Sequence, residues 1–116
     1  MPTSTARAKT LRVSARKMRL VANLIRGKKV AEARNILRFT IKGASPMLSK
    51  VLEQAVANAE SKAAETRQRI NADDMIVKTL EVGQGPTFRR YGVSPRGRGV
   101  RIRKRTSHIE LVLADK

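Results

Sequence analysis

The sequence contains no cysteine, and its only aromatic residues are Phe39, Phe88 and Tyr91. The lack of cysteine excludes disulfides and thiolate metal sites. With so few aromatic rings, we do not expect stacking of nucleobases on aromatic platforms to be the main mode of binding. No apolar run reaches the roughly 18 residues that a membrane-spanning helix needs, and the basic N-terminal residues precede no apolar stretch with a cleavage site. We therefore expect a cytoplasmic protein without membrane contact.

Acidic residues are also scarce, and the imbalance of charge is large. The 116 residues include 9 Asp and Glu against 26 Lys and Arg, which gives a formal net charge of +17 and a pI near 11.7. Like charges repel one another in a compact protein, so a polyanionic partner is expected. Nucleic acid fits best, because each phosphate that is contacted releases condensed counterions. The length is that of one domain, and a hydrophobic content of 41% is enough for a modest core.

The positive charge is concentrated in two blocks that contain no acid. The N-terminal basic block, residues 1–29, carries Arg7, Lys9, Arg12, Arg16, Lys17, Arg19, Arg26, Lys28 and Lys29. The C-terminal basic block, residues 89–105, carries Arg89, Arg90, Arg96, Arg98, Arg101, Arg103, Lys104 and Arg105. Because a solvated surface normally intersperses both signs of charge, the two blocks predict two RNA-facing parts on an ordinary globular body.

Hydrophobic periodicity predicts two short helices in the first forty residues. Ser14 is a good N-cap, Gly27 is a plausible stop, and the apolar residues between them recur at the spacing of one helix face. These residues are Met18, Val21, Ala22 and Ile25. The second helix is predicted over residues 30–39 and is followed by Lys42 and Gly43. Its apolar face consists of Val30, Ala33, Ile36 and Leu37.

A third and longer helix is predicted to begin with Ser45 as its N-cap and Pro46 at its first helical position. It has the most regular apolar stripe of the chain, formed by Leu48, Val51, Leu52, Ala55, Val56 and Ala59. The helix should end within the polar stretch 60–74, whose last four residues are typical of a turn. We expect this helix to be the centre of the core.

Alternation at period two predicts extended segments before and after the helices. The first covers residues 5–13. A strand at residues 75–82 should place Ile76, Leu80 and Val82 on one face. The last segment, residues 100–113, is predicted to be one long strand.

One face of the last predicted strand is basic in its first half and apolar in its second half. Its odd positions lie on one side of the strand and read Arg101, Arg103, Arg105, Ser107, Ile109, Leu111 and Leu113. The apolar half should lie on the core, while the basic half should project from it beside a partner strand that ends near Val82. We therefore predict one domain, residues 1–116, with a globular body (1–82 and 106–116) and an extended hairpin (83–105). At about 3.4 Å per residue and about 11 residues per arm, the hairpin would reach roughly 35 Å.

Other readings of these residues are weaker. The run at 89–105 could be a solvated loop, but the strand phasing and the lack of acids oppose this. The glycines of the hairpin lack the spacing of a phosphate-binding loop. Asp73 and Asp74 fit a turn or a cap better than a metal pair, and Ser45 and Ser107 have no partner base for catalysis. The single histidine, His108, is compatible with packing at a strand end or with phosphate contact. We predict no catalytic site, no metal site and no cofactor.

Several blocks of the sequence, in order, resemble one family. They read SARKMRLVA at residues 14–22, LIRGK at 24–28, KVLE at 50–53, ANAE at 57–60, GP at 85–86 and KRTSHI at 104–109. Together they are similar to the bacterial large-subunit ribosomal protein number twenty-two family over nearly the whole chain. The hairpin departs from the family pattern of basic, small, any, Gly, basic, because Ser94 and Pro95 occupy its first two positions, whereas Gly97 and Arg98 match.

The resemblance implies an α+β fold in which three helices pack on a small antiparallel sheet with a long protruding basic β-hairpin. It also implies binding to large-subunit rRNA early in assembly, neighbouring large-subunit ribosomal proteins as partners, and a hairpin that lines the nascent-peptide exit tunnel near the macrolide site. The hairpin residues that would face the nascent polypeptide are Arg89, Arg90, Tyr91, Gly92, Val93, Ser94, Pro95, Arg96, Gly97 and Arg98.

The predicted rRNA-binding residues are the lysines and arginines of both basic blocks, together with three residues of the KRTSHI motif. The latter are Thr106, Ser107 and His108. Two rival functions fit less well. A DNA-binding protein of the helix-turn-helix kind should expose base-reading polar residues on one helix, and an RNA-modifying enzyme should show a cofactor loop or a catalytic cluster. Neither pattern is present, so we expect a structural protein of the ribosome and not an enzyme.

Overall fold

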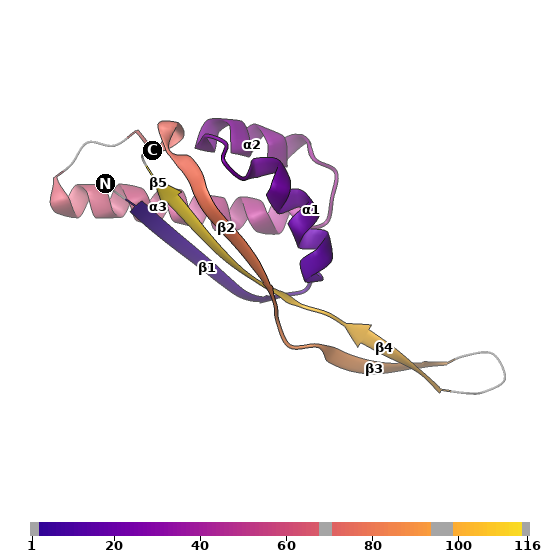
Figure 1. Cartoon of the computed structure of the whole chain (residues 1–116). Helices are drawn as coiled ribbons and strands as arrows, with labels where there is room; N and C mark the ends of the chain where they lie inside the picture. Colours follow the sequence, from indigo (N-terminus) through magenta and orange to yellow (C-terminus); the bar gives the residue numbers. More distant parts are fainter. Residues whose placement is uncertain (1–2, 68–70, 94–98, 115–116) are drawn as a thin grey trace.

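The computed structural model describes residues 3–67, 71–93 and 99–114. In these residues three helices pack on a three-stranded antiparallel sheet, and a two-stranded antiparallel sheet extends from it (Figure 1). The elements are β1 (Thr3–Leu11), α1 (Ala15–Ile25), α2 (Val30–Phe39), α3 (Ser45–Thr66), the 3-10 helix η1 (Ala72–Asp74), β2 (Ile76–Gln84), β3 (Phe88–Val93), β4 (Gly99–Lys104) and β5 (Ser107–Ala114). The predicted α+β fold class is confirmed.

Strand β5 lies at the centre of the larger sheet, in the order β1-β5-β2. Its Ser107, Ile109, Leu111 and Leu113 are buried, while the positions between them are half-buried. One face of the sheet therefore carries the core, as the odd positions predicted. Strands β3 and β4 pair from Phe88 with Lys104 to Val93 with Gly99.

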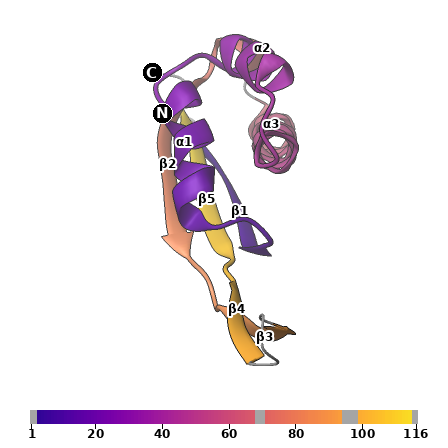
Figure 2. The ribbon, with the colours of Figure 1, turned by 90° about the vertical axis from the view of Figure 1, so that its right-hand side faces the viewer.

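Helices α1 and α3 cover the buried face of the sheet, and α2 packs on both of them (Figure 2). The apolar stripes predicted for α1 and α3 are buried, and α2 has the predicted bounds. Ser14 caps α1 by accepting a hydrogen bond from the backbone N–H of Lys17 (3.4 Å), and Gly27 follows the helix with a φ of +80°. That positive φ is the conformation that glycine adopts at low cost after a helix.

Three expectations about element details are wrong. Ser45 is not the N-cap of α3, because Ala44 takes that position and Ser45 is already helical. The last strand is not continuous, because β4 ends at Lys104 and β5 begins at Ser107. In β2 it is Val77, and not Ile76, that is buried with Leu80 and Val82. The register of β2 against β5 shifts between Val77 and Thr79, and such a bulge reverses the side-chain phase of a strand.

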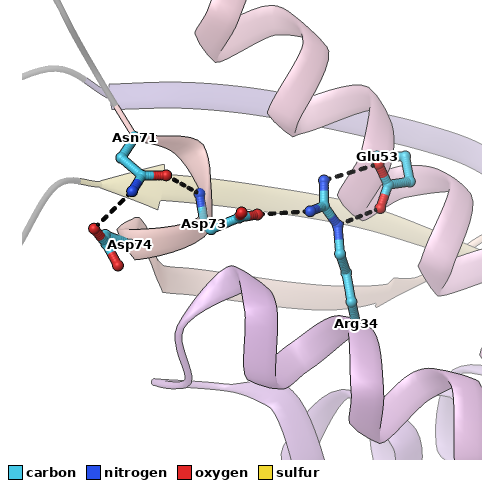
Figure 3. A network of polar contacts seen from close by, with 5 residues as sticks. All are labelled: Arg34, Glu53, Asn71, Asp73 and Asp74. Carbon is cyan, nitrogen blue, oxygen red and sulfur yellow. Dashed lines mark hydrogen bonds and ion pairs between the residues drawn. The ribbon is translucent and has the colours of Figure 1, made fainter.

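A network of charges joins α2 to α3 and to η1 (Figure 3). Arg34 of α2 binds both carboxylate oxygens of Glu53, at 2.6 and 3.1 Å, and Oδ1 of Asp73 at 2.7 Å. The hydrogen bond with Glu53 is the main reason that the pKa of Arg34 is raised. Asn71 holds η1 by accepting from the N–H of Asp73 (3.2 Å) and donating to Asp74 (3.0 Å). The two aspartates thus belong to a turn, as predicted, and Asp73 in addition forms an ion pair with Arg34.

Candidate nucleic-acid interface

The hairpin leaves the sheet through a tight contact between its two arms. The backbone N–H of Gly85 donates to the carbonyl of Thr106 (3.0 Å), and the hydroxyl of Thr106 donates to the carbonyl of Pro86 (2.6 Å). A Cβ at Gly85 would collide with Thr106 Oγ1 and would lie 3.0 Å from Cε1 of His108. Glycine is therefore required at residue 85, and this contact, the hairpin clasp (Gly85, Pro86 and Thr106), separates β4 from β5.

His108 supports the strand beside the clasp. Its Nδ1 accepts a hydrogen bond from the backbone N–H of Thr10 at 2.9 Å. Thr10 has a φ of 56°, and the register of β1 against β5 shifts between Ala8 and Leu11. The imidazole thus accepts a hydrogen bond from the Thr10 N–H, which the irregular pairing of β1 with β5 does not satisfy. This contact favours the strand-packing reading of His108 over phosphate contact.

A polar cleft lies between the start of α1 and the hairpin clasp. It has a volume of about 630 Å³ and is lined by Ser14, Ala15, Arg16, Arg19, Gln84, Gly85, Thr87, Arg89, Arg103, Arg105 and Thr106. Five of these described lining residues are arginines and none is acidic. The cleft also lies at the N-terminus of α1, whose first turn holds no acid and which carries a partial positive charge. The arrangement can bind an anion.

A larger cleft, the apolar cleft, adjoins the first. Its volume is about 1180 Å³, and its lining residues are Arg12, Val13, Ser14, Lys17, Leu20, Lys42, Gly43, Ala44, Phe88, Arg103, Lys104, Arg105 and Thr106. It shares Ser14, Arg103, Arg105 and Thr106 with the polar cleft. The described lining again contains cations and no acid. The two clefts thus form one connected surface at the base of the hairpin.

The fold brings cations of the two basic blocks together on this surface. Nine exposed cations line the two clefts, namely Arg12, Arg16, Lys17, Arg19, Lys42, Arg89, Arg103, Lys104 and Arg105. Eight of them were predicted from the acid-free blocks. Lys42 was missed, because it lies in the mixed central part of the sequence and reaches the surface only through the loop between α2 and α3. No signal in the sequence separates it from other surface lysines.

Two predicted arginines also hold the fold together. Nε and Nη2 of Arg19 donate to the carbonyl of Val82 at 3.3 and 3.0 Å. Nη2 of Arg26 donates to the carbonyl of Leu80 at 2.7 Å. Both contacts bind α1 to β2. Arg19 therefore combines a place in the polar cleft with a structural bond, a role that charge patterning alone does not reveal.

Other predicted residues lie apart from the clefts. Arg7 and Lys9 are on the exposed face of β1, where Arg7 forms an ion pair with Glu110 at 3.3 Å. Lys28 and Lys29 are exposed beside the start of β2, because the Lys28 carbonyl accepts from the N–H of Val77 and Lys29 pairs with Ile76. They lie at the end of the sheet opposite the hairpin. The structure thus does not gather the N-terminal block into one site.

The remaining predicted residues belong to the hairpin and its base. Thr106 and Ser107 are 2% and 0% exposed, so their side chains pack inside the protein. Arg90, Tyr91, Gly92 and Val93 in β3 pair with Ile102, Arg101, Val100 and Gly99 in β4. Ser94, Pro95, Arg96, Gly97 and Arg98 lie outside the described residues. The 66 Å long axis of the molecule reflects this extended hairpin (Figure 1).

Residues 3–67, 71–93 and 99–114 contain no group of three or more His, Asp or Glu side chains that could hold a metal ion. Within the same residues, none of the helices combines the length and the apolar character needed to cross a membrane.

The chain is similar to known proteins over almost its whole length. Residues 6–114 match the family model described as ribosomal protein L22p/L17e. The large ribosomal subunit protein uL22 of Pediococcus pentosaceus is 47% identical over 111 residues, which cover 96% of this chain and 90% of the relative. The protein of the same name from Macrococcus caseolyticus is 47% identical, covering 94% and 84%. That of Staphylococcus aureus strain JH9 is 46% identical, covering 93% and 88%.

Proposed function

Because the chain belongs to the ribosomal protein L22p/L17e family, we propose that it binds large-subunit rRNA through the two clefts and lines the nascent-peptide exit tunnel with its hairpin. Family membership makes it a structural protein of the large ribosomal subunit, located in the cytoplasmic ribosome, and not an enzyme. Large-subunit rRNA and neighbouring ribosomal proteins are its partners. If the hairpin lines the exit tunnel, the nascent polypeptide is a further partner.

The observation that carries the rRNA proposal is the connected surface of nine exposed cations without an acid among its described lining residues. Closely spaced like charges are unfavourable in the free protein, and phosphates relieve the repulsion. Each contacted phosphate also releases counterions from the RNA. Since the surface combines cations of both basic blocks, an RNA strand at the hairpin base would contact α1 and the hairpin at once. Such binding reads the shape of the RNA and not its base sequence.

The cations outside the clefts extend the proposal to further RNA segments. Lys28 and Lys29 lie at the far end of the sheet, and Lys9 lies on its open face. These positions would contact RNA segments other than the one at the hairpin base, so the protein would bridge them during assembly. The buried Thr106 and Ser107 are left out of the rRNA-binding set, because their side chains are not accessible. His108 is kept only as a support for β1.

The hairpin itself is proposed to depend on RNA for its stability. An isolated two-stranded ribbon is marginal in water, and β3 and β4 pair only with one another among the described strands. In the proposed division, the body comprises 1–82 and 106–116, and the hairpin comprises 83–105. RNA around the hairpin would hold it in place, with residues 89–98 at the tunnel wall.

The proposal is tested by washing large subunits that carry a tagged copy of the full chain in rising salt. We expect the protein to remain on the large subunit at salt concentrations that release proteins held by surface charge alone, because contacts enclosed by folded RNA dissociate slowly. Free protein should bind purified large-subunit rRNA in preference to duplex DNA of equal length. Complete release, together with equal binding to both nucleic acids, would contradict the proposal.

A further inference from the structure

The two clefts at the hairpin base differ in the chemistry of their lining residues. The polar cleft has polar groups and arginines, with Ala15 as its one apolar side chain among the described lining residues. The apolar cleft contains Val13, Leu20 and Phe88 beside its cations. Leu20 is 60% exposed and Phe88 is 41% exposed. A phosphate backbone alone would contact the arginines of the polar cleft. It would make no apolar contact with Val13, Leu20 and Phe88 in the apolar cleft.

Two apolar side chains of this cleft, Leu20 and Phe88, lie outside the hydrophobic core. Leu20 lies on α1 outside the buried stripe, and Phe88 begins β3, where it pairs with Lys104. Neither belongs to the cluster of buried core residues. An exposed aromatic ring among cations suits a ligand that has both a flat apolar part and negative charge. A nucleotide combines a base, which stacks on aromatic side chains, with a phosphate.

Continuity between the clefts favours RNA over an acidic peptide. Arg103 and Arg105 line both clefts, so a chain whose phosphates occupy the polar cleft would continue directly into the apolar one. The volume of about 1180 Å³ exceeds the range of about 300–1,000 Å³ that is usual for pockets of drug-sized ligands. The volume is therefore large enough for a nucleotide.

We propose that the apolar cleft holds an unpaired nucleotide of the large-subunit rRNA, with its base against Phe88 and Leu20 and its phosphate beside Lys17 and Arg103. This inference rests on the proposed function. It adds that the protein selects RNA with an unpaired nucleotide at this position. The duplex must be interrupted at the hairpin base, because a paired base is not available for stacking. The protein would thus recognise a bulge or a loop at this point by its shape.

The test uses the full chain, its variants and protein-free large-subunit rRNA. Base-specific methylation and carbodiimide reagents report accessible unpaired bases, while hydroxyl radicals report protected backbone. We compare the wild-type protein with Phe88→Ala and Phe88→Leu. The matched control is Phe39→Ala, which removes a ring that is 77% exposed and does not line either cleft. Circular dichroism verifies that each variant is folded.

With the wild-type protein we expect protection of one or a few unpaired bases inside the backbone footprint. Phe88→Ala should expose these bases, leave most of the backbone footprint unchanged, and weaken rRNA binding on the order of 5- to 150-fold, the range that loss of one stacked base corresponds to. Phe88→Leu removes the flat ring without a large change of volume and should expose the same bases. Phe39→Ala should behave as the wild type.

Two results would overturn the inference and are distinguishable from failure of the proposed function. If the Phe88 variants give the same base protections as the wild type, the cleft does not hold a base. If the backbone is protected but no base is, and Phe88 becomes inaccessible only in whole subunits, a protein segment occupies the cleft. If the wild-type protein gives no footprint at all on the rRNA, the proposed function itself fails.

Discussion

Substitution of Gly85 by alanine tests the hairpin clasp. The added Cβ would collide with Thr106 Oγ1 and would lie 3.0 Å from Cε1 of His108. Thr106 is 2% exposed and donates a hydrogen bond to the carbonyl of Pro86, so it cannot move away without loss of that bond. The conflict must therefore be relieved by a shift of the two hairpin arms.

The expected cost follows from two contributions. Forcing an additional carbon into a well-packed site costs about 1–3 kcal/mol, and loss of the Thr106 hydrogen bond costs about 1 kcal/mol. The free energy of unfolding of Gly85→Ala should thus fall by about 2–4 kcal/mol. At about 4 °C per kcal/mol for a domain of this size, the Tm should fall by about 8–16 °C.

Thermal unfolding of the full chain, followed by circular dichroism, measures this change. The matched control is Gly83→Ala in β2, two residues before Gly85, because a Cβ at Gly83 would meet nothing within 4 Å. The double variant Gly85→Ala with Thr106→Ala should be more stable than the sum of the two single effects predicts, since one partner of the collision is gone. If Gly85→Ala is as stable as Gly83→Ala, the clasp does not constrain the hairpin.

Three further variants separate structural from binding roles. Arg34→Gln, which breaks the network between the helices, should lower the free energy of unfolding by about 1 kcal/mol in a urea titration, whereas Lys50→Gln on the exposed side of α3 should change it little. Ser107→Ala should raise the Tm, because it removes a buried hydroxyl that has no hydrogen-bond partner among the described residues. Burying such a hydroxyl costs about 1–3 kcal/mol of stability. A lower Tm would show that the hydroxyl is hydrogen-bonded. Arg19→Gln and Arg16→Gln should both weaken rRNA binding, but only Arg19→Gln should also reduce stability, by about 1 kcal/mol.

Much of the fold follows from local patterns in the sequence. The α1 stripe, its cap at Ser14 and its stop at Gly27 all follow from the period of the helix and the conformational preferences of the two terminal residues. The phase of the last strand predicted which side chains of β5 are buried, because residues 107 to 113 alternate without a shift. These features depend on neighbours in sequence, so a pattern can reveal them.

Other features depend on contacts between distant residues. The bulge in β2 is set by its pairing with β5, and it buries Val77 in place of Ile76. The break between β4 and β5 depends on the clasp formed by Gly85 and Thr106, which are 21 positions apart in the printed sequence. Periodicity assumes an unbroken strand and cannot detect either.

The same distinction holds for the candidate site. Charge patterning supplied eight of its nine cations, because the blocks lack acids. Lys42 joins them only through tertiary packing. Phe88 likewise acquires its place beside the cations from the pairing of β3 with β4, so its proposed role in binding could not be predicted from the scarcity of aromatic residues.

The assignment of rRNA binding to the two clefts is tested by the salt dependence of rRNA binding for two variants of equal net charge. Lys17→Gln with Arg103→Gln removes two cations of the clefts, and Lys50→Gln with Lys78→Gln removes two exposed cations elsewhere. Each phosphate contact contributes about 0.7–0.9 to the slope of log K against log salt. We expect the cleft variant to lose about 1.4–1.8 from the magnitude of this slope, while the other variant keeps the slope of the wild type. Equal slopes for the two variants would contradict the assignment of rRNA binding to the hairpin base.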